Sequence, residues 1–452
     1  MSQQLITPAA ARLHLSPTLA INELVLRTRA TGKTVIHLGF GEATFPIPKD
    51  VLKAHVDASS STSYLPVAGL QVLRKSIAQY NSQRLGIQID ESQVIIGPGS
   101  KPLLFTLFDI MEGDVLLPRP SWVSYEPQVH HAQKRLFWVE TDEHDRHTIT
   151  TDALEAAYAK STSAGNGARI MLINSPSNPT GKVFGRETLL RVASFCASKR
   201  ITLISDDIYS DLCFDPTDLT NSCFASASFN LETPLNVIMT GGLSKTYSAG
   251  GWRVGYAIFP ATELGNALLT TTLAYASECW SAASAPAQEA ATLAFSTSMT
   301  MNEYRTRVRA VHKYCTTKLY SALKALGLAV SEPQGGFYVY PSYHPFTKEL
   351  HSLGVQTSAN LSKWLIQNFG IAALPGSAFG EEDGEQGLAG GKLRLRMATS
   401  YLYFADEVER YREGYRILDA AGNGQMPQLP LLDVAISALT LSVKRLEQIR
   451  TK

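Results

Sequence analysis

Residues 237–256 read Val237-Ile-Met-Thr-Gly-Gly-Leu-Ser-Lys245-Thr-Tyr-Ser-Ala-Gly-Gly-Trp-Arg253-Val-Gly-Tyr256. Val237–Met239 and Val254–Ala257 are short runs of β-forming residues, which indicates two buried strands joined by a glycine-rich loop, with Arg253 at the start of the second. Ligands of open α/β sheets bind beyond the carboxyl ends of the strands, so Lys245 is expected at a ligand site. An ammonium group at such a partly desolvated edge has a lowered pKa and can become a nucleophile.

Further short β-rich runs precede this stretch and alternate with helical patterns such as Pro102–Ile110 and Arg186–Ser198. The alternation predicts an α/β fold in which helices cover both faces of a mainly parallel sheet. The runs are Val94–Ile96, Asp114–Leu117, Ile170–Ile173 and Ile201–Ile204.

The last third of the chain has a different pattern, with strand-like and helical segments that predict a smaller α+β domain. We therefore expect an N-terminal arm and part of the small domain in residues 1–45, a large domain in 46–324 and the small domain in 325–420. Residues 421–452 begin as a linker, and an amphipathic helix is expected to pack on the body or on a subunit partner. Its apolar face consists of Leu432, Ile436, Leu439, Val443 and Leu446.

Composition limits the classes of function that this chain can have. Of the 452 residues, 44% are apolar, and 41 Lys and Arg balance 40 Asp and Glu to a net charge of +1. This balance argues against a broad basic surface for nucleic acid or an anionic membrane, so a small-molecule partner is expected. The five cysteines form no C-x-x-C pair, and the N-terminus has no continuous apolar segment. We expect a cytoplasmic protein with reduced thiols and no metal.

Polar or aromatic side chains lie at the ends of five of the predicted strands or in the loops beside them. A sheet with a purely structural role would not need such side chains at one edge. Two glycine-rich segments, Gly97–Lys101 and Gly241–Thr246, do not fit the P-loop pattern of nucleotide-binding proteins. A Gly-Ser pair at the start of the helix 102–110 would still offer free backbone N–H groups to a phosphate. The side chains at this edge are Trp122, Tyr125, Asn178, Asp206, Tyr209, Lys245 and Arg253.

In this order, the motifs resemble those of the pyridoxal-phosphate-dependent aminotransferases of the aspartate aminotransferase superfamily, class I/II, fold type I. The resemblance runs from about residue 35 to 418. It implies a seven-stranded sheet, a pyridoxal 5′-phosphate cofactor, and amino acid and 2-oxo acid substrates. The matching stretches are Leu38–Glu42, Tyr64–Arg74, Gly99–Lys101, Pro120–Tyr125, Asn174–Gly181, Ser205–Tyr209, Ser244–Tyr247, Gly251–Tyr256, Pro333–Tyr338, Leu374–Gly380 and Arg394–Ser400.

The resemblance implies three catalytic residues. Lys245 would form a Schiff base with the cofactor and later move a proton between the substrate Cα and the cofactor. Asp206 would pair with the ring nitrogen and keep the ring an electron sink. Tyr209, together with Asn178, would hydrogen-bond to the ring 3′-oxygen.

The phosphate end of the cofactor would be held by Arg253 and by the backbone N–H groups of Ser100 and Lys101. Many relatives carry a phosphate-binding serine where this chain has Gly242, so Ser244 or a backbone N–H is expected to compensate, or phosphate binding to be weaker. Tyr64 would reach the phosphate in the other subunit, which implies a homodimer with shared active sites.

At the substrate end, Trp122 would stack on the cofactor ring beside the bound substrate. Arg394 would bind the substrate α-carboxylate in a forked geometry, with help from the Gly41 backbone and Asn178. Arg394 and Arg396 alternate along one strand and share a face, and only the resemblance selects Arg394. The sequence does not say whether Trp280 lines the substrate pocket or packs.

The leading hypothesis from the sequence is an amino-acid aminotransferase. A lyase, decarboxylase or oxidase on the same scaffold remains an alternative, because these enzymes use the same Lys, Asp and Tyr. A ligand-controlled transcription regulator is disfavoured, because such proteins carry a fused DNA-binding domain and little chain precedes residue 35. The amino donor is left open.

Overall fold

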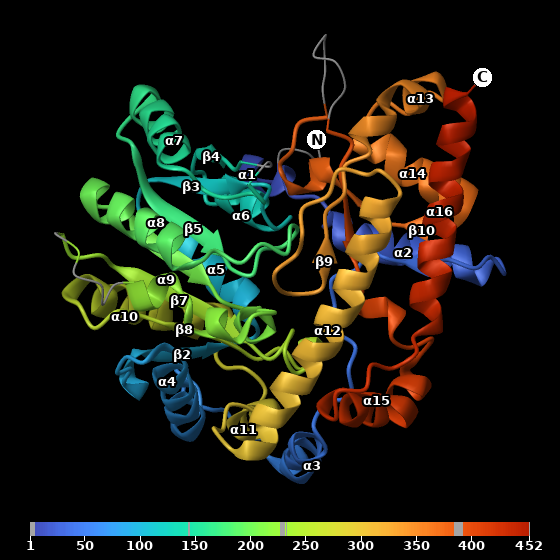
Figure 1. Ribbon diagram of the computed structural model, residues 1–452. Helices are drawn as coiled ribbons and strands as arrows, with labels where there is room; N and C mark the ends of the chain where they lie inside the picture. Colours follow the sequence, from blue (N-terminus) through green and yellow to red (C-terminus); the bar gives the residue numbers. More distant parts are fainter. Residues whose placement is uncertain (1–4, 143–144, 227–230, 232, 384–391, 452) are drawn as a thin grey trace.

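The computed structural model describes residues 5–142, 145–226, 231, 233–383 and 392–451 (Figure 1). Within these ranges, no helix is both long and apolar enough to cross a membrane. The stretch Gly380–Gly391 is rich in Gly and Glu, which predicts an exposed loop, and it falls largely outside the described residues.

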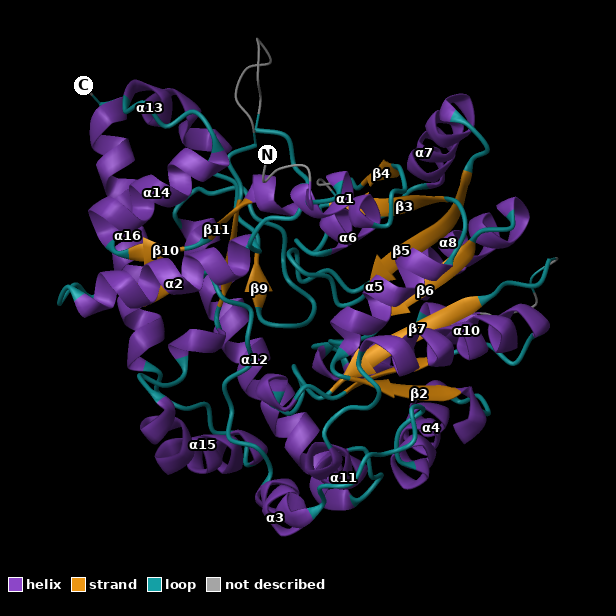
Figure 2. Cartoon of the chain, turned by 180° about the vertical axis from the view of Figure 1, so that it is seen from behind, coloured by secondary structure: helices purple, strands orange, loops and turns teal. Residues whose placement is uncertain are grey.

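A seven-stranded sheet forms the centre of the larger part of the molecule, in the order β2-β8-β7-β6-β5-β3-β4 (Figure 2). Only β8 runs antiparallel to its neighbours, so the predicted mainly parallel α/β sheet is confirmed. The sequence had not indicated β4, a partly exposed strand at the edge. The strands are β2 Val94–Gly97, β3 Asp114–Arg119, β4 Leu136–Glu140, β5 Ala168–Asn174, β6 Thr202–Asp206, β7 Val237–Gly242 and β8 Gly255–Ile258.

Alternate residues of the central strands pack on opposite faces of the sheet, as the two-residue period of a strand requires. On β5, Met171 and Ile173 join one hydrophobic cluster, whereas Ile170 and Leu172 join another. The first cluster includes residues of α7, α8 and α12, and the second includes residues of α5, α6 and α10. These helices are α5 Ser100–Ile110, α6 Tyr125–His131, α7 Thr151–Ala164, α8 Arg186–Lys199, α10 Glu263–Cys279 and α12 Met299–Ala325.

The remaining strands form two small sheets beside the large one. The first has the order β11-β12-β9, and in the second the N-terminal strand β1 pairs in parallel with β10. Residues before position 45 therefore share a sheet with the C-terminal part of the chain. The domain boundaries at 45/46 and 324/325 stay predictions. The strands are β1 Ile36–His37, β9 Tyr338–Val339, β10 Ile371–Ala372, β11 Leu374–Pro375 and β12 Leu395–Ala398.

The C-terminal helix α16, Pro430–Arg450, lies along the outside of this smaller part (Figure 1). Its apolar face packs on this chain, which is one of the two outcomes expected from the sequence: Leu432, Leu439, Val443 and Leu446 are fully buried. Ion pairs fasten both ends, because Asp433 lies 2.7 Å from Lys318 and Arg450 lies 2.6 Å from Glu349. The helix contacts α12, α13 Thr347–Ser352 and α14 Ser358–Phe369.

Candidate active site

The carboxyl ends of the three central strands meet at one edge of the sheet. Asn174 ends β5 and lies opposite Asp206, which ends β6 and in turn lies opposite Thr240 of β7. A cavity of about 310 Å³ opens there. This is the place where ligands of parallel α/β sheets bind.

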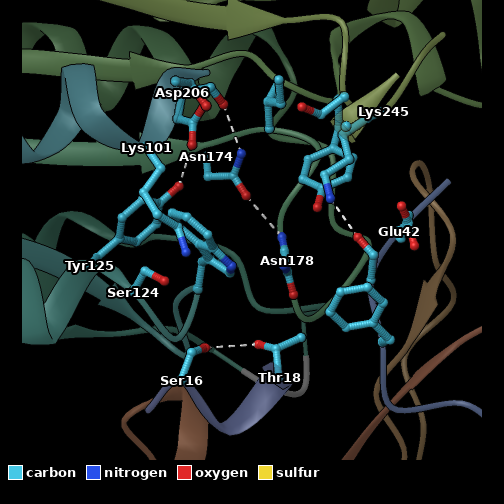
Figure 3. Close-up of a pocket in the computed structure, with 18 of the residues that line it drawn as sticks. Ser16, Thr18, Glu42, Lys101, Ser124, Tyr125, Asn174, Asn178, Asp206 and Lys245 are labelled. Atoms are coloured by element: carbon cyan, nitrogen blue, oxygen red, sulfur yellow. Dashed lines mark hydrogen bonds between the residues drawn. The ribbon is translucent and has the colours of Figure 1, made fainter. Parts of the chain in front are cut away.

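Figure 3 shows most of the residues that line this cavity. Ten of the twelve site residues predicted from the sequence are among them, namely Gly41, Ser100, Lys101, Trp122, Asn178, Asp206, Tyr209, Ser244, Lys245 and Arg253. Tyr64 and Arg394 are not. The lining also includes residues that had been given no role, namely Ser16, Thr18, Leu19, Phe40, Glu42, Ser124, Tyr125, Asn174, Ile208, Gly250 and Arg396.

Lys245 extends from the loop after β7 into the cavity. Its Nζ donates a hydrogen bond to the Gly41 carbonyl at 2.5 Å (Figure 3). Burial lowers the pKa of Lys245 to about 8, with a further contribution from the nearby Arg396 cation. At pH 7 about a tenth of the amine would be deprotonated, against about 0.04% of a lysine with the ordinary pKa of about 10.4. The site therefore makes Lys245 a competent nucleophile.

Asp206 lines the cavity and is 3% exposed, and two hydroxyls hold its carboxylate. Tyr125 donates to it at 2.6 Å and Thr240 at 3.0 Å. Burial raises the pKa of Asp206 to about 6, while these hydrogen bonds work in the opposite direction. A buried carboxylate of this kind would be stabilised by a cationic ring nitrogen.

Asn174 joins Asp206 to Asn178 across two neighbouring strand ends. Its amide nitrogen donates to the Asp206 carbonyl at 2.7 Å, and its amide oxygen accepts from the Asn178 backbone N–H at 2.9 Å (Figure 3). The backbone that presents both Asp206 and Asn178 is thereby fixed by one side chain. Asn174 stood in a matching motif, but nothing in the sequence distinguished it from an ordinary strand-end residue.

Another part of the cavity lining suits an anion. Helix α5 begins at Ser100, directly after Gly99, whose φ of 93° lies in the region that favours glycine. A Cβ on Gly255 would lie 2.3 Å from the Ser100 nitrogen, so only glycine permits this close approach of β8 to the helix end. Arg253 does not belong to β8 as predicted, but lies just before it and donates to the carbonyls of Gly250 and Pro98 at 2.7 and 3.2 Å.

Aromatic side chains also line the cavity. Trp122 packs edge-to-face on Tyr125, with ring centroids 5.1 Å apart, and the Lys101 ammonium lies 5.0 Å from the Trp122 ring centroid. Trp280, whose position had been left open, packs beside Tyr275 in the hydrophobic cluster of α5, α6 and α10 and does not line this cavity.

The expectation that Arg394 faces the substrate is not matched by the structure. Arg394 lies 2.7 Å from the Glu381 carboxylate and outside the cavity lining. Arg396, which is 1% exposed, lines the cavity and donates to Asn178 Oδ1 at 3.2 Å and to the Gly39 carbonyl at 2.5 Å.

The two arginines differ in how their charge is balanced. In the part of the chain that the structure describes, no carboxylate lies within 4 Å of the Arg396 guanidinium, and its Nε has no hydrogen-bond partner. Arg394 already has Glu381 as its counter-ion. A buried cation without a counter-ion attracts an anion strongly, and this favours Arg396 over Arg394 as the arginine that receives a carboxylate.

Comparison with known proteins agrees with this geometry. Residues 33–401 match the family described as aminotransferase class I and II. An aspartate aminotransferase of Bacillus sp. strain YM-2 is 31% identical, over 90% of this chain and 98% of its own. An asparagine–oxo-acid transaminase of Streptococcus mutans is 27% identical, over 87% of this chain and 95% of its own. The solved aspartate aminotransferase of Thermotoga maritima is 25% identical, with a TM-score of 0.73 over 93% of this chain and 99% of that chain.

These matches and the sheet with its buried lysine define an enzyme of fold type I that uses pyridoxal 5′-phosphate. The chain belongs to the aminotransferase class I and II family, and it is a transaminase that moves amino groups between amino acids and 2-oxo acids. The leading hypothesis from the sequence is therefore confirmed, and the lyase alternative is not supported.

Proposed function

We propose that the cavity binds pyridoxal 5′-phosphate between Asp206 and the amino end of α5, and that an acidic amino acid is the donor. The observation that carries the first part is the presence of Lys245 and Asp206 in one cavity with Arg253 and with Ser100, the first residue of α5. The residues fit the cofactor because the carboxylate suits the ring nitrogen and the cationic end suits the phosphate. Ser244 also lines the cavity and can contribute a hydroxyl at that end.

When bound, the cofactor supplies an aldehyde for covalent capture of the amino group and a ring that withdraws electrons. Lys245 then holds a proton at its Nζ and moves it between the substrate Cα and a carbon atom of the cofactor. Asp206, as a carboxylate, holds a proton on the ring nitrogen. Tyr209 donates its hydroxyl proton toward the ring 3′-oxygen, and Trp122 covers one face of the ring and excludes water from it.

Arg396 and Asn178 orient the donor by its α-carboxylate. The Arg396–Asn178 hydrogen bond and the Arg396 bond to the Gly39 carbonyl hold the guanidinium in one orientation before substrate arrives. Because these contacts are already formed, little side-chain entropy is lost on binding.

Lys101 is the residue in the cavity that favours an acidic side chain on the donor. Burial and the neighbouring Arg253 lower the pKa of its ammonium group, so a carboxylate partner would relieve an uncompensated cation. Ser16 and Thr18, joined to each other by a hydrogen bond of 3.2 Å, bring two further hydroxyls to the cavity. The names of relatives that act on aspartate support the same class of donor.

Replacing Lys101 by methionine tests this part of the proposal. The backbone N–H of residue 101 remains, so cofactor binding is expected to persist. A charge-assisted hydrogen bond is worth about 1.5–3 kcal/mol, so kcat/KM for aspartate should fall about 10- to 150-fold, and that for alanine by less than about 3-fold. The control Lys101→Arg should retain most of the preference for aspartate. Equal losses with both donors would contradict the role of Lys101, and a wild-type preference for alanine would contradict the acidic donor.

We also propose that two chains share each active site. Tyr64 is 96% exposed and lies outside the cavity of its own chain, which leaves it free to reach the phosphate site of a partner. Light scattering on the purified protein should then give a mass of about 99 kDa, twice the 49.3 kDa of the chain. A mass of one chain at micromolar concentration would contradict the shared site. The cytoplasmic location expected from the sequence stays a prediction.

A further inference from the structure

Tyr338 of β9 contacts the site from behind Tyr209 and does not line the cavity itself. Its hydroxyl oxygen lies 2.6 Å from the Tyr209 hydroxyl oxygen and 3.4 Å from the Gly41 carbonyl oxygen. The side chain is 1% exposed. A Cβ on Gly41 would lie 2.4 Å from the Tyr338 hydroxyl, so the glycine leaves room for this contact.

Each tyrosine hydroxyl has one proton to donate, so the two cannot both donate in the bond between them. In the arrangement seen here, Tyr338 donates to the Gly41 carbonyl, and Tyr209 therefore donates to Tyr338. That arrangement uses the only proton of Tyr209. When Tyr209 donates to a group in the cavity instead, its oxygen becomes an acceptor for Tyr338. The bond that Tyr338 gives up to the Gly41 carbonyl is the longer of its two, 3.4 Å against 2.6 Å, so turning away from Gly41 costs little.

We propose that Tyr338 is a positioning residue that strengthens Tyr209 as a hydrogen-bond donor to the ring 3′-oxygen by turning its own proton from Gly41 to Tyr209. This inference rests on the proposed role of Tyr209. A hydroxyl that accepts one hydrogen bond donates a stronger one, since hydrogen bonds in a chain polarise one another. A stronger donor stabilises the deprotonated form of the bound cofactor relative to its protonated form.

The charges around the pair favour the same direction. The Arg396 guanidinium lies 4.9 Å from the centroid of the Tyr338 ring, and the Lys245 ammonium lies 5.6 Å from that of Tyr209. Once Lys245 is joined to the cofactor, Arg396 remains as a separate cation, and it disfavours a further proton at the site. The other ionisable groups that face the pair are Asp206 and Tyr125. Tyr125 donates its hydroxyl proton to the Asp206 carboxylate at 2.6 Å, so it does not donate to the pair.

The test is a pH titration of the bound cofactor's visible absorbance in Tyr338→Phe holoenzyme. Loss of one hydrogen bond should raise the titration midpoint by about 0.4–1 pH unit. Tyr209→Phe should raise it further, and the double variant should match Tyr209→Phe, because Tyr338 acts only through Tyr209. Tyr343→Phe removes a hydroxyl from a fully buried residue outside the cavity and should leave the midpoint unchanged.

The outcomes separate this inference from the function on which it rests. If Tyr209→Phe raises the midpoint and Tyr338→Phe leaves it unchanged or lowers it, the role of Tyr338 is wrong and the proposed function stands. If the double variant exceeds Tyr209→Phe, Tyr338 acts by another route and the inference is again wrong. If wild-type protein shows no titrating absorbance with added cofactor, or Tyr209→Phe has no effect, the proposed role of Tyr209 fails first.

Discussion

Replacing Lys245 by alanine is expected to lower the rate of amino transfer by about 10⁴-fold or more. Two separate contributions disappear, because Nζ is both the nucleophile that captures the cofactor and the base that moves the proton. Positioned general bases alone contribute about 10²–10⁴-fold. The measurement is the single-turnover rate of the cofactor absorbance after addition of an amino donor.

Two controls separate chemistry from folding in this experiment. Lys182→Ala removes a half-buried lysine that lies outside the cavity, and it should leave the rate within about 2-fold of wild type. Added small primary amines should restore part of the rate in Lys245→Ala, because they supply a base where Nζ is missing. Wild-type rates in Lys245→Ala would show that a different residue performs these steps.

The pH dependence of cofactor capture follows from the lowered pKa of Lys245. Below its pKa of about 8 the amine is mostly protonated and cannot attack, and above it the neutral form prevails. The capture rate of cofactor-free enzyme should therefore rise between pH 7 and pH 9 and then level off. With an ordinary lysine, the capture rate would continue to rise until about pH 10.4. This profile distinguishes a desolvated Lys245 from a solvent-exposed one.

The strands, and the site residues that directly follow them, could be predicted because both follow from local sequence patterns. Runs such as Ile170–Ile173 are buried on both faces of the sheet and are therefore continuously apolar. Because neighbouring strands run parallel, the residues that follow them all lie at the same edge of the sheet. Strand β4 was missed for the converse reason, since only Val139 among its five residues is fully buried. A strand at the edge of a sheet is partly exposed and therefore does not need the continuous apolar run of a central strand.

What could not be predicted depends on contacts between distant segments. The structure distinguishes Arg394 from Arg396 through Glu381, which lies in a loop and gives Arg394 its counter-ion. Tyr338 belonged to a matching motif, yet its contact with Tyr209 spans 129 positions in the sequence. Ser16 and Thr18 lie at the start of the N-terminal helix α2, Pro17–Ala30, whose own pattern says nothing of a cavity. The alternation of residues along a strand predicts which face of the sheet a side chain lies on, but not which distant residue it contacts.

Replacing Arg396 by glutamine is expected to lower kcat/KM for every amino donor by about 10²- to 10³-fold. A buried charge pair that loses one partner costs about 3–5 kcal/mol, because the substrate carboxylate would enter a dry site without its cation. The loss should appear chiefly in KM for both the amino acid and the 2-oxo acid, since both carry the same carboxylate. Arg396→Lys should recover only part of it, because an ammonium cannot make the forked contact.

Arg394→Gln is the matched comparison, because the two arginines lie two positions apart and are both at least nine-tenths buried. This substitution leaves Glu381 without its counter-ion, so it should lower thermal stability while KM stays within about 3-fold of wild type. The opposite pattern, a large KM effect at 394 and none at 396, would restore the assignment that the sequence favoured. The comparison is decisive because each variant removes the same charge two positions apart, and the two side chains differ in whether they face the cavity or Glu381.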